Sequence, residues 1–414
     1  MKKYTILPLS VAIASALSSG VVLANEEAFE VQAIDDQQPL IINSETDVTE
    51  GVVFSGYARY GAAYQAGDSK LVSPAGNLNG VSAGRLGNED NGGEFQIAKA
   101  FNGANGTIWD VVVMAEHWFN SAWSDNSAGL DLKKAYAGVT NVFESQPNMY
   151  FWAGRDFHQR PQLGLNDYFW MTHDGQGGGF YNMDLGGVNL DLSVVGAVDG
   201  AGGSLVNDNG KYALTSKLHG IEFSETANLS IYANYGFASE QAKGEDYYDT
   251  TAYQIAGELN FSGQRLIVRY SENALDSVYD LAEGRTALLV NFDGSQAITD
   301  KAAIEYLASY QKLEEDDKFE ENRINYNAIV RPTYAWDDVH STWLEAGYSV
   351  VDYEDSSENN SAWKVTLSQN ISIGSETWDR PMLRFYATVG EADNKHDDSK
   401  YDTFTIGAMW EAWW

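Results

Sequence analysis

The sequence predicts an all-β fold, a transmembrane antiparallel β-barrel. In the segment 403–414 every even-numbered residue is apolar, whereas the odd-numbered residues are mixed. Because the side chains of a strand point to opposite faces in turn, this segment can meet hydrocarbon on one side and water on the other. Strands cross a bilayer only as a closed barrel, which satisfies all their backbone polar groups. The alternative is the last strand of a soluble sandwich, which would bury the same apolar face.

The first residues predict export. Lys2 and Lys3 precede an apolar stretch at 6–17, and Val22-Leu23-Ala24 has the small-residue pattern at which signal peptidase cleaves. We therefore expect residues 1–24 to be a cleaved signal peptide and the mature chain to reach the outer membrane of a Gram-negative cell. No later stretch approaches the about 18 consecutive apolar residues of a transmembrane helix.

The composition agrees with a barrel. The chain has 24 Tyr and 12 Trp, which suit aromatic girdles at the membrane interfaces, and 39 Gly, which suit turns and curved strands. Removing residues 1–24 takes away two lysines, which leaves 24 basic residues against 59 acidic ones and a net charge of −35. This charge argues against nucleic acid as a partner and indicates acidic loops and a lumen that favours cations. Cysteine is absent, so no disulfide holds the loops together.

Residues 25–52 differ from the rest of the chain. They include eight acidic residues and no Lys or Arg, without strand alternation or a heptad. We interpret them as a flexible acidic periplasmic extension. An ordered plug for a pore is the alternative.

From residue 53 to residue 414 the sequence is typical of strands and turns. Apolar and polar residues alternate at 188–195, 344–351, 363–368 and 384–389, and the polar face includes charges. Such a face suits a water-filled lumen better than a sandwich core, where each charge would need a buried partner. The region has room for roughly 16 to 18 strands of about 10 residues, a size that leaves an aqueous channel.

Several polar stretches are expected to be surface loops, at 67–84, 120–131, 199–211, 313–323 and 352–361. The Gly-rich run Gly175–Gly179 lacks the strand–loop–helix context of a phosphate cradle and is also expected to be a loop. A calcium site in the acidic loops stays open, although no Asp-x-Asp-x-Asp-Gly spacing occurs. We expect no cofactor.

Near the start of the barrel region an aromatic and a basic residue share one strand face. Tyr57 and Arg59 are two residues apart, and Trp413 falls on the inward face of the last strand. Sugars offer apolar C–H faces and a rim of hydroxyls, so a sugar path should pair aromatic rings with charged hydrogen-bonding groups. Taken singly, each aromatic residue is more typical of packing or of a girdle than of a sugar path.

Five motifs occur in a fixed order along the chain. They are Gly56-Tyr57-Ala58-Arg59, Arg85-Leu86-Gly87-Asn88-Glu89, Trp152-Ala153-Gly154-Arg155 followed by Gln159-Arg160, Trp378-Asp379-Arg380-Pro381, and Trp413-Trp414. By their order and spacing, residues 53–414 resemble the maltoporin-type carbohydrate porins. The resemblance implies an 18-stranded barrel, a homotrimer with one sugar channel per subunit, and an inward-folded third loop that narrows each pore.

The resemblance also implies which residues a sugar would pass. Tyr57, Trp378 and Trp413 look like members of an aromatic path, and Trp123 looks like the aromatic that a second loop extends into the neighbouring subunit, with Trp118 as the alternative. The residues that look like an ionic track and constriction are Arg59, Arg85, Glu94, Lys133, Arg160, Asp167 and Phe169.

The chain also departs from the family pattern. Gln162 and Gly164 stand where maltodextrin-specific members have an acidic residue and a histidine, and Phe169 replaces a tyrosine, as in sucrose-type members. One aromatic of the middle strands is absent at Gly263, with Phe261 close by. We therefore expect a different or broader sugar range than that of a maltodextrin channel.

Three other classes of protein remain as alternatives. A general porin would have no saturable sugar site. An outer-membrane barrel enzyme would need a nucleophile beside a base, and the six histidines are scattered outside any nucleophile motif. A soluble secreted lectin would not need detergent for extraction. The leading interpretation is a sugar-selective outer-membrane porin through which oligosaccharides diffuse passively, without catalytic activity. Its expected partners are oligosaccharides, outer-membrane lipid and lipopolysaccharide, and further copies of the chain.

Overall fold

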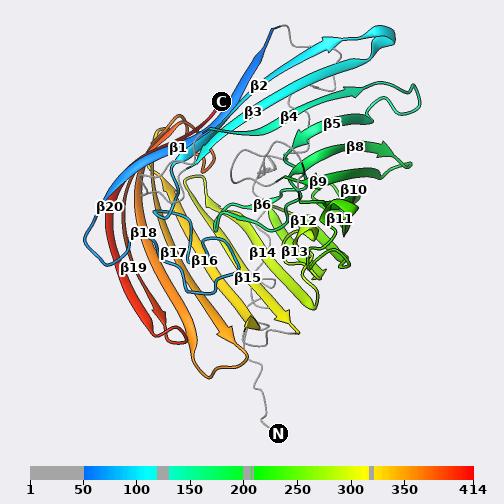
Figure 1. Ribbon diagram of the computed structural model, residues 1–414. Helices are drawn as coiled ribbons and strands as arrows, with labels where there is room; N and C mark the ends of the chain where they lie inside the picture. Colours follow the sequence, from blue (N-terminus) through cyan, green and yellow to red (C-terminus); the bar gives the residue numbers. More distant parts are fainter. Residues whose placement is uncertain (1–50, 119–129, 199–206, 208, 317–320) are drawn as a thin grey trace. The chain divides into compact units, whose positions relative to one another are not determined.

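The computed structural model describes residues 51–118, 130–198, 207, 209–316 and 321–414, and eighteen strands in this part of the chain form one antiparallel sheet (Figure 1). The first nine are β1 (Val53–Gln65), β2 (Gly92–Asn102), β3 (Ile108–Trp118), β4 (Asp131–Thr140), β5 (Tyr150–Asp156), β8 (Gly175–Asp184), β9 (Asn189–Ala197), β10 (Lys211–Ser224) and β11 (Ala227–Ala238). The other nine are β12 (Ala252–Phe261), β13 (Gln264–Glu272), β14 (Arg285–Thr299), β15 (Ala302–Glu315), β16 (Arg323–Ala335), β17 (His340–Tyr353), β18 (Asn359–Ser372), β19 (Met382–Asn394) and β20 (Ser399–Trp413).

The sheet closes on itself. Each strand of this sheet pairs with the strand of the sheet that follows it along the chain, β5 with β8 among them. β1 pairs with both β2 and β20, so that blue and red strands lie side by side in Figure 1. At this seam Tyr57 is opposite Trp413, and the backbone groups of Gly56 and Trp414 exchange two hydrogen bonds of 3.0 and 3.1 Å. The predicted all-β barrel is confirmed, with the 18 strands that the family resemblance implies.

The two faces of the wall match the alternation in the sequence. On β17, β18 and β20 the outward side chains Leu344, Leu367 and Ile406 are about half exposed. On the inward faces of β17 and β20, Glu345 and Glu411 are almost completely buried. The outer face is therefore apolar and the inner face carries charges, as expected for a barrel that meets lipid outside and polar groups inside.

The first long loop, residues 66–91 between β1 and β2, folds into the barrel. The prediction of a surface loop at 67–84 was wrong, because Val72, Asn79 and Ala83 are fully buried. The backbone N–H of Leu78 donates to the side chain of Asn325 on β16 (2.9 Å). A polar loop can be buried here because the polar inner wall supplies its hydrogen-bond partners.

The third long loop, residues 157–174 between β5 and β8, also folds inward. It contains a two-stranded hairpin, β6 (Gln162–Leu163) and β7 (Tyr168–Phe169). Its residues Leu163, Trp170 and Met171 are fully buried in one cluster with inward residues of β13–β16, among them Ile267 and Ile329. The inner wall therefore has an apolar patch that holds this loop in place.

The two inward loops are bonded to each other. The N–H of Val81 donates to the carbonyl of Asn166 (2.6 Å), and the N–H of Arg85 donates to the carbonyl of Leu165 (2.9 Å). The Asn166 side chain in turn donates to the carbonyl of Asn79 (3.1 Å). The loops therefore form one continuous obstruction within the lumen.

The prediction of a loop at the Gly-rich run Gly175–Gly179 was wrong, because these residues form the first half of β8. A Cβ atom at Gly177 would lie 2.0 Å from the carbonyl oxygen of Val194, and one at Gly179 would lie 2.2 Å from that of Leu192. Glycine is required because β8 and β9 approach closely.

Short single-turn helices η1 (Ala104–Gly106), η2 (Glu240–Ala242) and η3 (Val278–Asp280) lie in connections. Among the described residues, no helix is long and apolar enough to cross a membrane. The expected signal peptide and all of the acidic extension except Gly51 and Val52 lie outside the described residues.

Candidate functional site

The candidate site lies on the inner face of β20, β1, β2 and β3, where two neighbouring rows of residues run across the strands. The registers give one row as Trp413, Tyr57, Glu94 and Glu116, and the next as Glu411, Arg59, Gly92 and Trp118. Strand alternation points all these side chains toward the lumen. Residues that are more than 350 positions apart in the sequence thus lie side by side.

Three aromatic rings adjoin one another in these rows. The ring centroids of Tyr57 and Trp413 are 6.4 Å apart and nearly parallel, and those of Tyr57 and Trp118 are 6.1 Å apart. The Arg380 guanidinium lies 4.6 Å from the centroid of the Trp413 ring, within cation–π distance. The predicted pair of Tyr57 and Trp413 therefore forms one surface with Trp118.

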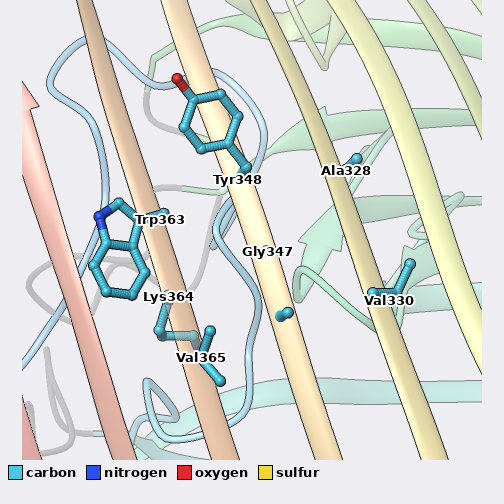
Figure 2. Close-up of a pocket in the computed structure, with 8 residues that line it drawn as sticks. Ala328, Val330, Gly347, Tyr348, Trp363, Lys364 and Val365 are labelled. Atoms are coloured by element: carbon cyan, nitrogen blue, oxygen red, sulfur yellow. The ribbon is translucent and has the colours of Figure 1, made fainter.

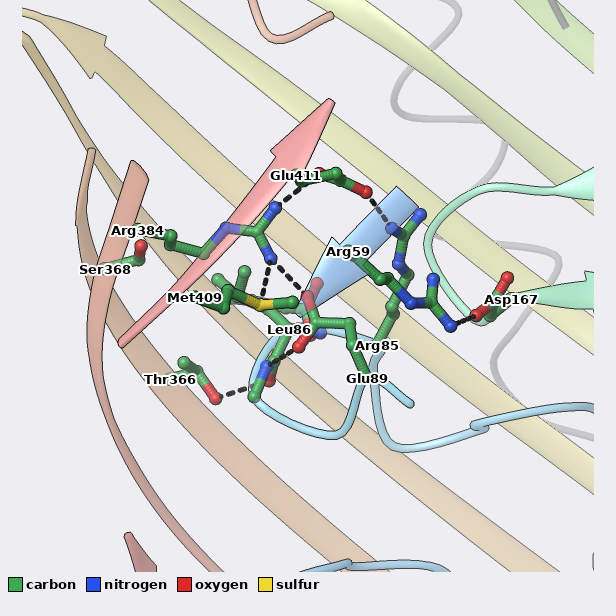
Figure 3. A network of polar contacts seen from close by, with 12 residues as sticks. Arg59, Arg85, Leu86, Glu89, Asp167, Thr366, Ser368, Arg384, Met409 and Glu411 are labelled. Carbon is green, nitrogen blue, oxygen red and sulfur yellow. Dashed lines mark hydrogen bonds and ion pairs between the residues drawn. The ribbon is translucent and has the colours of Figure 1, made fainter. Parts of the chain in front are cut away.

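The Glu411 carboxylate lies at the centre of the charged part of the site (Figure 3). It is 1% exposed and accepts hydrogen bonds from the Tyr57 hydroxyl (2.6 Å), from Arg380 Nε (2.9 Å) and from Arg384 Nη2 (2.7 Å). Arg85 of the first loop also pairs with it, and Arg384 pairs with Glu89 of the same loop. A buried carboxylate is stable only with such compensation, so this cluster fixes the first loop against the wall.

Arg59 connects β1 to both inward loops. Its Nη2 lies 2.9 Å from Asp167 Oδ2 in the third loop, and its Nε donates to the carbonyl of Asp90 in the first loop (2.8 Å). Burial raises the pKa of Asp167, but Arg59 and Arg85 outweigh it and hold that pKa below its usual value. Arg59 itself is 5% exposed, so most of its surface faces protein groups.

A second cluster lies within the third loop. The Arg160 guanidinium is between two rings, 4.0 Å from the centroid of Phe157 and 4.1 Å from that of Phe169. It also lies 3.4 Å from Asp174. Phe169 pairs with Gln162 in the β6–β7 hairpin, and the Gln162 side chain donates to Asp167. This hairpin therefore links the two clusters.

Of the remaining predicted residues, Glu94 belongs to the row of Tyr57 and Lys133 adjoins it. Lys133 on β4 pairs with Glu116 at 2.8 Å, and Glu94 lies opposite both Tyr57 and Glu116 in the strand registers. Trp378 lies in the turn between β18 and β19 and is 38% exposed. Trp123 lies outside the described residues.

Sequence reasoning did not assign roles to a further set of lumenal charges. Glu345 is fully buried and pairs with Arg331 Nη2 (2.6 Å) and Lys364 (3.4 Å). Lys364 also donates to the carbonyls of Gly84 and Leu86 in the first loop. Strand alternation identifies the inward face of Glu345, Lys364, Arg384 and Glu411, but their partners depend on strand register and loop path.

The start of the third loop is anchored by a buried histidine. His158 Nδ1 is 3.0 Å from the Tyr181 hydroxyl and Nε2 is 2.6 Å from the Thr215 hydroxyl. Burial lowers the pKa of His158 to about 4, so the ring is neutral at ordinary pH. A hydroxyl beside an imidazole is the arrangement of a nucleophile and its base, but His158 and Thr215 are each 1% exposed and out of reach of a solute.

One hollow of about 320 Å³ is on the opposite side of the wall (Figure 2). Its lining includes Tyr348, Trp363, Val330 and Val365, which point outward from β16, β17 and β18. It faces away from the lumen, so it is not part of the candidate site.

Several solved structures are similar to this chain. The chain is similar to OccAB1 of Acinetobacter baumannii (10% identity, 88% of this chain and 97% of that one, TM-score 0.51). It is also similar to OccD3 (OpdP) of Pseudomonas aeruginosa (12%, 88% and 92%, 0.47). A third similar structure is Wzi, a carbohydrate-binding outer-membrane β-barrel involved in group 1 capsule assembly in Escherichia coli (10%, 86% and 83%, 0.44). At 10% identity the similarity to OccAB1 shows the fold alone.

The sequence itself matches a family model along nearly the whole described barrel. The match is to LamB porin and covers residues 52–414, from the residue before β1 to the last residue of the chain. The closed barrel and its polar inner face agree with that match. The chain therefore belongs to the LamB porin family, and it is an outer-membrane β-barrel porin.

Proposed function

We propose that the chain is a sugar-selective porin through which oligosaccharides diffuse passively across the outer membrane. The observation that carries the proposal is the inward aromatic surface of Tyr57 and Trp413 beside the Arg380 guanidinium. Aromatic rings suit the apolar face of a sugar, and charged groups at their edge suit its hydroxyls.

The two inward loops support selectivity. A solute crossing the lumen has to pass the hairpin of the third loop, where Arg160 and Phe169 lie, and the adjoining first loop. Narrowing the lumen brings a solute close to the wall, so that weak contacts with the rings are made at every passage. Contacts of this kind bind weakly enough to allow release, as conduction requires.

The constriction suggests a sugar range unlike that of a maltodextrin channel. Gln162 is bonded to Asp167, and an added Cβ atom at Gly164 would meet nothing within 4 Å. Neither position offers the charged or imidazole group of maltodextrin-specific members. We expect a different or broader range of oligosaccharides to be accepted.

Further parts of the proposal concern assembly. We propose a homotrimer in contact with lipid and lipopolysaccharide, exported by a signal peptide at residues 1–24, with residues 25–52 as a periplasmic extension. Within the trimer, Trp123 would reach the neighbouring subunit. The trimer is tested by cross-linking of the detergent-purified protein, and the cleavage site by N-terminal sequencing.

A general porin is the second candidate, and one observation favours it. Arg59 and Arg384 are almost completely buried and paired with carboxylates. If this candidate is correct, their only role is to hold the loops in place. In that case the lumen would conduct ions without binding sugars.

One experiment separates the two candidates. The purified protein is reconstituted in a planar bilayer, and a panel of di- and oligosaccharides is titrated while the current is recorded. Saturable block by one sugar class supports the sugar-selective porin and identifies its substrate. Steady current with every sugar, at concentrations up to the solubility limit, would leave a general porin.

A further inference from the structure

Trp118 occupies a space that the neighbouring strand leaves free. In the register of β2 and β3, Trp118 is opposite Gly92, and Gly92 is in turn opposite Arg59 on β1. A Cβ atom at Gly92 would lie 2.4 Å from Cε3 and 2.6 Å from Cδ2 of the indole. The ring therefore lies over the glycine, and any side chain at position 92 would displace it.

From this place the indole reaches two residues of β1. The Arg59 guanidinium is 5.0 Å from the centroid of the Trp118 ring, and the Tyr57 ring is 6.1 Å away. Arg59 is itself held by Asp167 and by the carbonyl of Asp90, so it is a fixed support for the indole. The Trp118 side chain remains partly exposed.

We propose that Trp118 is a solute-contact residue that extends the aromatic surface of Trp413 and Tyr57 onto β3. This inference rests on the proposed function, because it names a residue of the same path. The exposed surface of the Trp118 indole contacts the apolar C–H face of a sugar ring, while Arg59 keeps the indole in place. The three rings then form a continuous platform from β20 across β1 to β3, and it passes over Gly92 of β2.

The absence of cysteine from the sequence permits a direct test. In Trp118→Cys the introduced thiol is the only one in the protein. A charged, membrane-impermeant methanethiosulfonate is applied to the reconstituted channel, and the current is followed with and without a blocking sugar. Val113→Cys is the matched control, because Val113 lies on the same strand and points outward, 46% exposed.

We expect the reagent to reduce the current through Trp118→Cys and to leave Val113→Cys unchanged. A sugar that blocks the wild-type channel should slow the reaction at position 118, because it occupies the same space. No reaction at position 118, or a reaction rate that the blocking sugar leaves unchanged, would overturn the inference while the proposed function stands. A wild-type channel that no sugar blocks would instead overturn the proposed function, and this inference with it.

A second pair of variants tests the stacking itself. We expect Trp118→Ala to raise the half-blocking sugar concentration by about two- to tenfold, the range of a single aromatic contact, and Trp118→Phe to raise it less. Heat-modifiable gel mobility verifies that both variants form barrels. Equal block in wild type and a folded Trp118→Ala channel would remove Trp118 from the path.

Discussion

Glu411 holds together parts of the chain that are far apart in the sequence. Its carboxylate binds a tyrosine of the first strand, two arginines from the region of β19 and an arginine of the first loop. Because the carboxylate is buried, its negative charge is balanced by these groups rather than by water. Its loss would leave Arg380 and Arg384 with like charges close together.

We predict that Glu411→Gln destabilises the barrel by about 3–5 kcal/mol, the usual cost of removing one partner from a buried ion pair. The measurement is the temperature at which the detergent-purified protein loses its compact gel mobility. Glu391→Gln is the control, because its partner Lys400 is 59% exposed and such surface pairs contribute little. Equal unfolding temperatures for wild type and Glu411→Gln would contradict the prediction.

Tyr57 contributes a ring to the path and a hydroxyl to the Glu411 cluster. We predict that Tyr57→Ala raises the half-blocking sugar concentration by about two- to tenfold and that Tyr57→Phe, which keeps the ring, raises it less. We expect Trp378→Ala to weaken block in the same direction. Tyr253→Ala is the control, because the Tyr253 side chain lies on the outer face of β12, where it is 51% exposed and away from the lumen. Unchanged block in Tyr57→Ala and Trp378→Ala would exclude both residues from the path.

At the scale of elements, the first loop depends on a close approach to the wall. A Cβ atom at Gly347 of β17 would lie 2.2 Å from the carbonyl oxygen of Ala83 and 2.6 Å from the carbonyl carbon of the same residue. Backbone atoms cannot rotate away as the end of a side chain can. At Gly347 the backbone of the loop therefore lies directly against the strand.

We predict that Gly347→Ala moves the first loop off the wall, at a cost of about 1–3 kcal/mol for overpacking, and increases the single-channel conductance. Unfolding temperature and conductance are both measured. Gly257→Ala on β12 is the matched control, since an added Cβ atom there meets nothing within 4 Å. A Gly347→Ala channel with wild-type stability and conductance would show that the loop can adjust without cost.

At the scale of the whole molecule, stability should depend on pH through buried neutral histidines of the third loop. Burial lowers the pKa of His158 to about 4, and burial, His158 and Arg269 lower that of His173 well below its usual value. Between pH 6.5 and 4 these histidines bind protons in the unfolded chain but stay neutral in the folded barrel. Their contribution to the free energy of unfolding is therefore fully present above pH 6.5 and is lost as the pH falls toward 4.

We predict that His158 alone accounts for a loss of about 3 kcal/mol over this interval. His158→Asn should be less stable than wild type at pH 7, and the difference should shrink as the pH is lowered toward 4. The measurement is the unfolding temperature of both proteins in detergent at a series of pH values. A constant difference between them would mean that His158 does not titrate on unfolding.

Much of the fold could be predicted from the sequence because it depends on alternation along single strands. The segment 403–414 showed which face of the last strand meets lipid, and the same pattern placed Glu345 and Lys364 inside. Tyr57, Arg59, Arg85, Trp413 and Asp167 were singled out and do lie together, although their contact with a solute stays a prediction.

The remainder depends on contacts that no local pattern records. Leu78 of the first loop bonds to Asn325, 247 residues away, so a polar segment that resembles a solvated loop is buried instead. The contact of Trp118 with Arg59 exists because Gly92 separates them in the register. Gly175–Gly179 resembled a loop because glycine seldom forms strands, and only its proximity to β9 explains it.

The seam between β1 and β20 has a consequence for the order in which the molecule assembles. Every other neighbouring pair in the ring is formed by strands that follow one another along the chain, whereas the Tyr57–Glu411 bond spans 354 residues. Pairing of such distant strands is slow, because a long loop must close first. Until β20 has been made, the growing sheet has two unpaired edges that can accept a strand from another protein. The seam is thus the last pairing of the ring that can form, because it needs both the first and the last strand of the sheet.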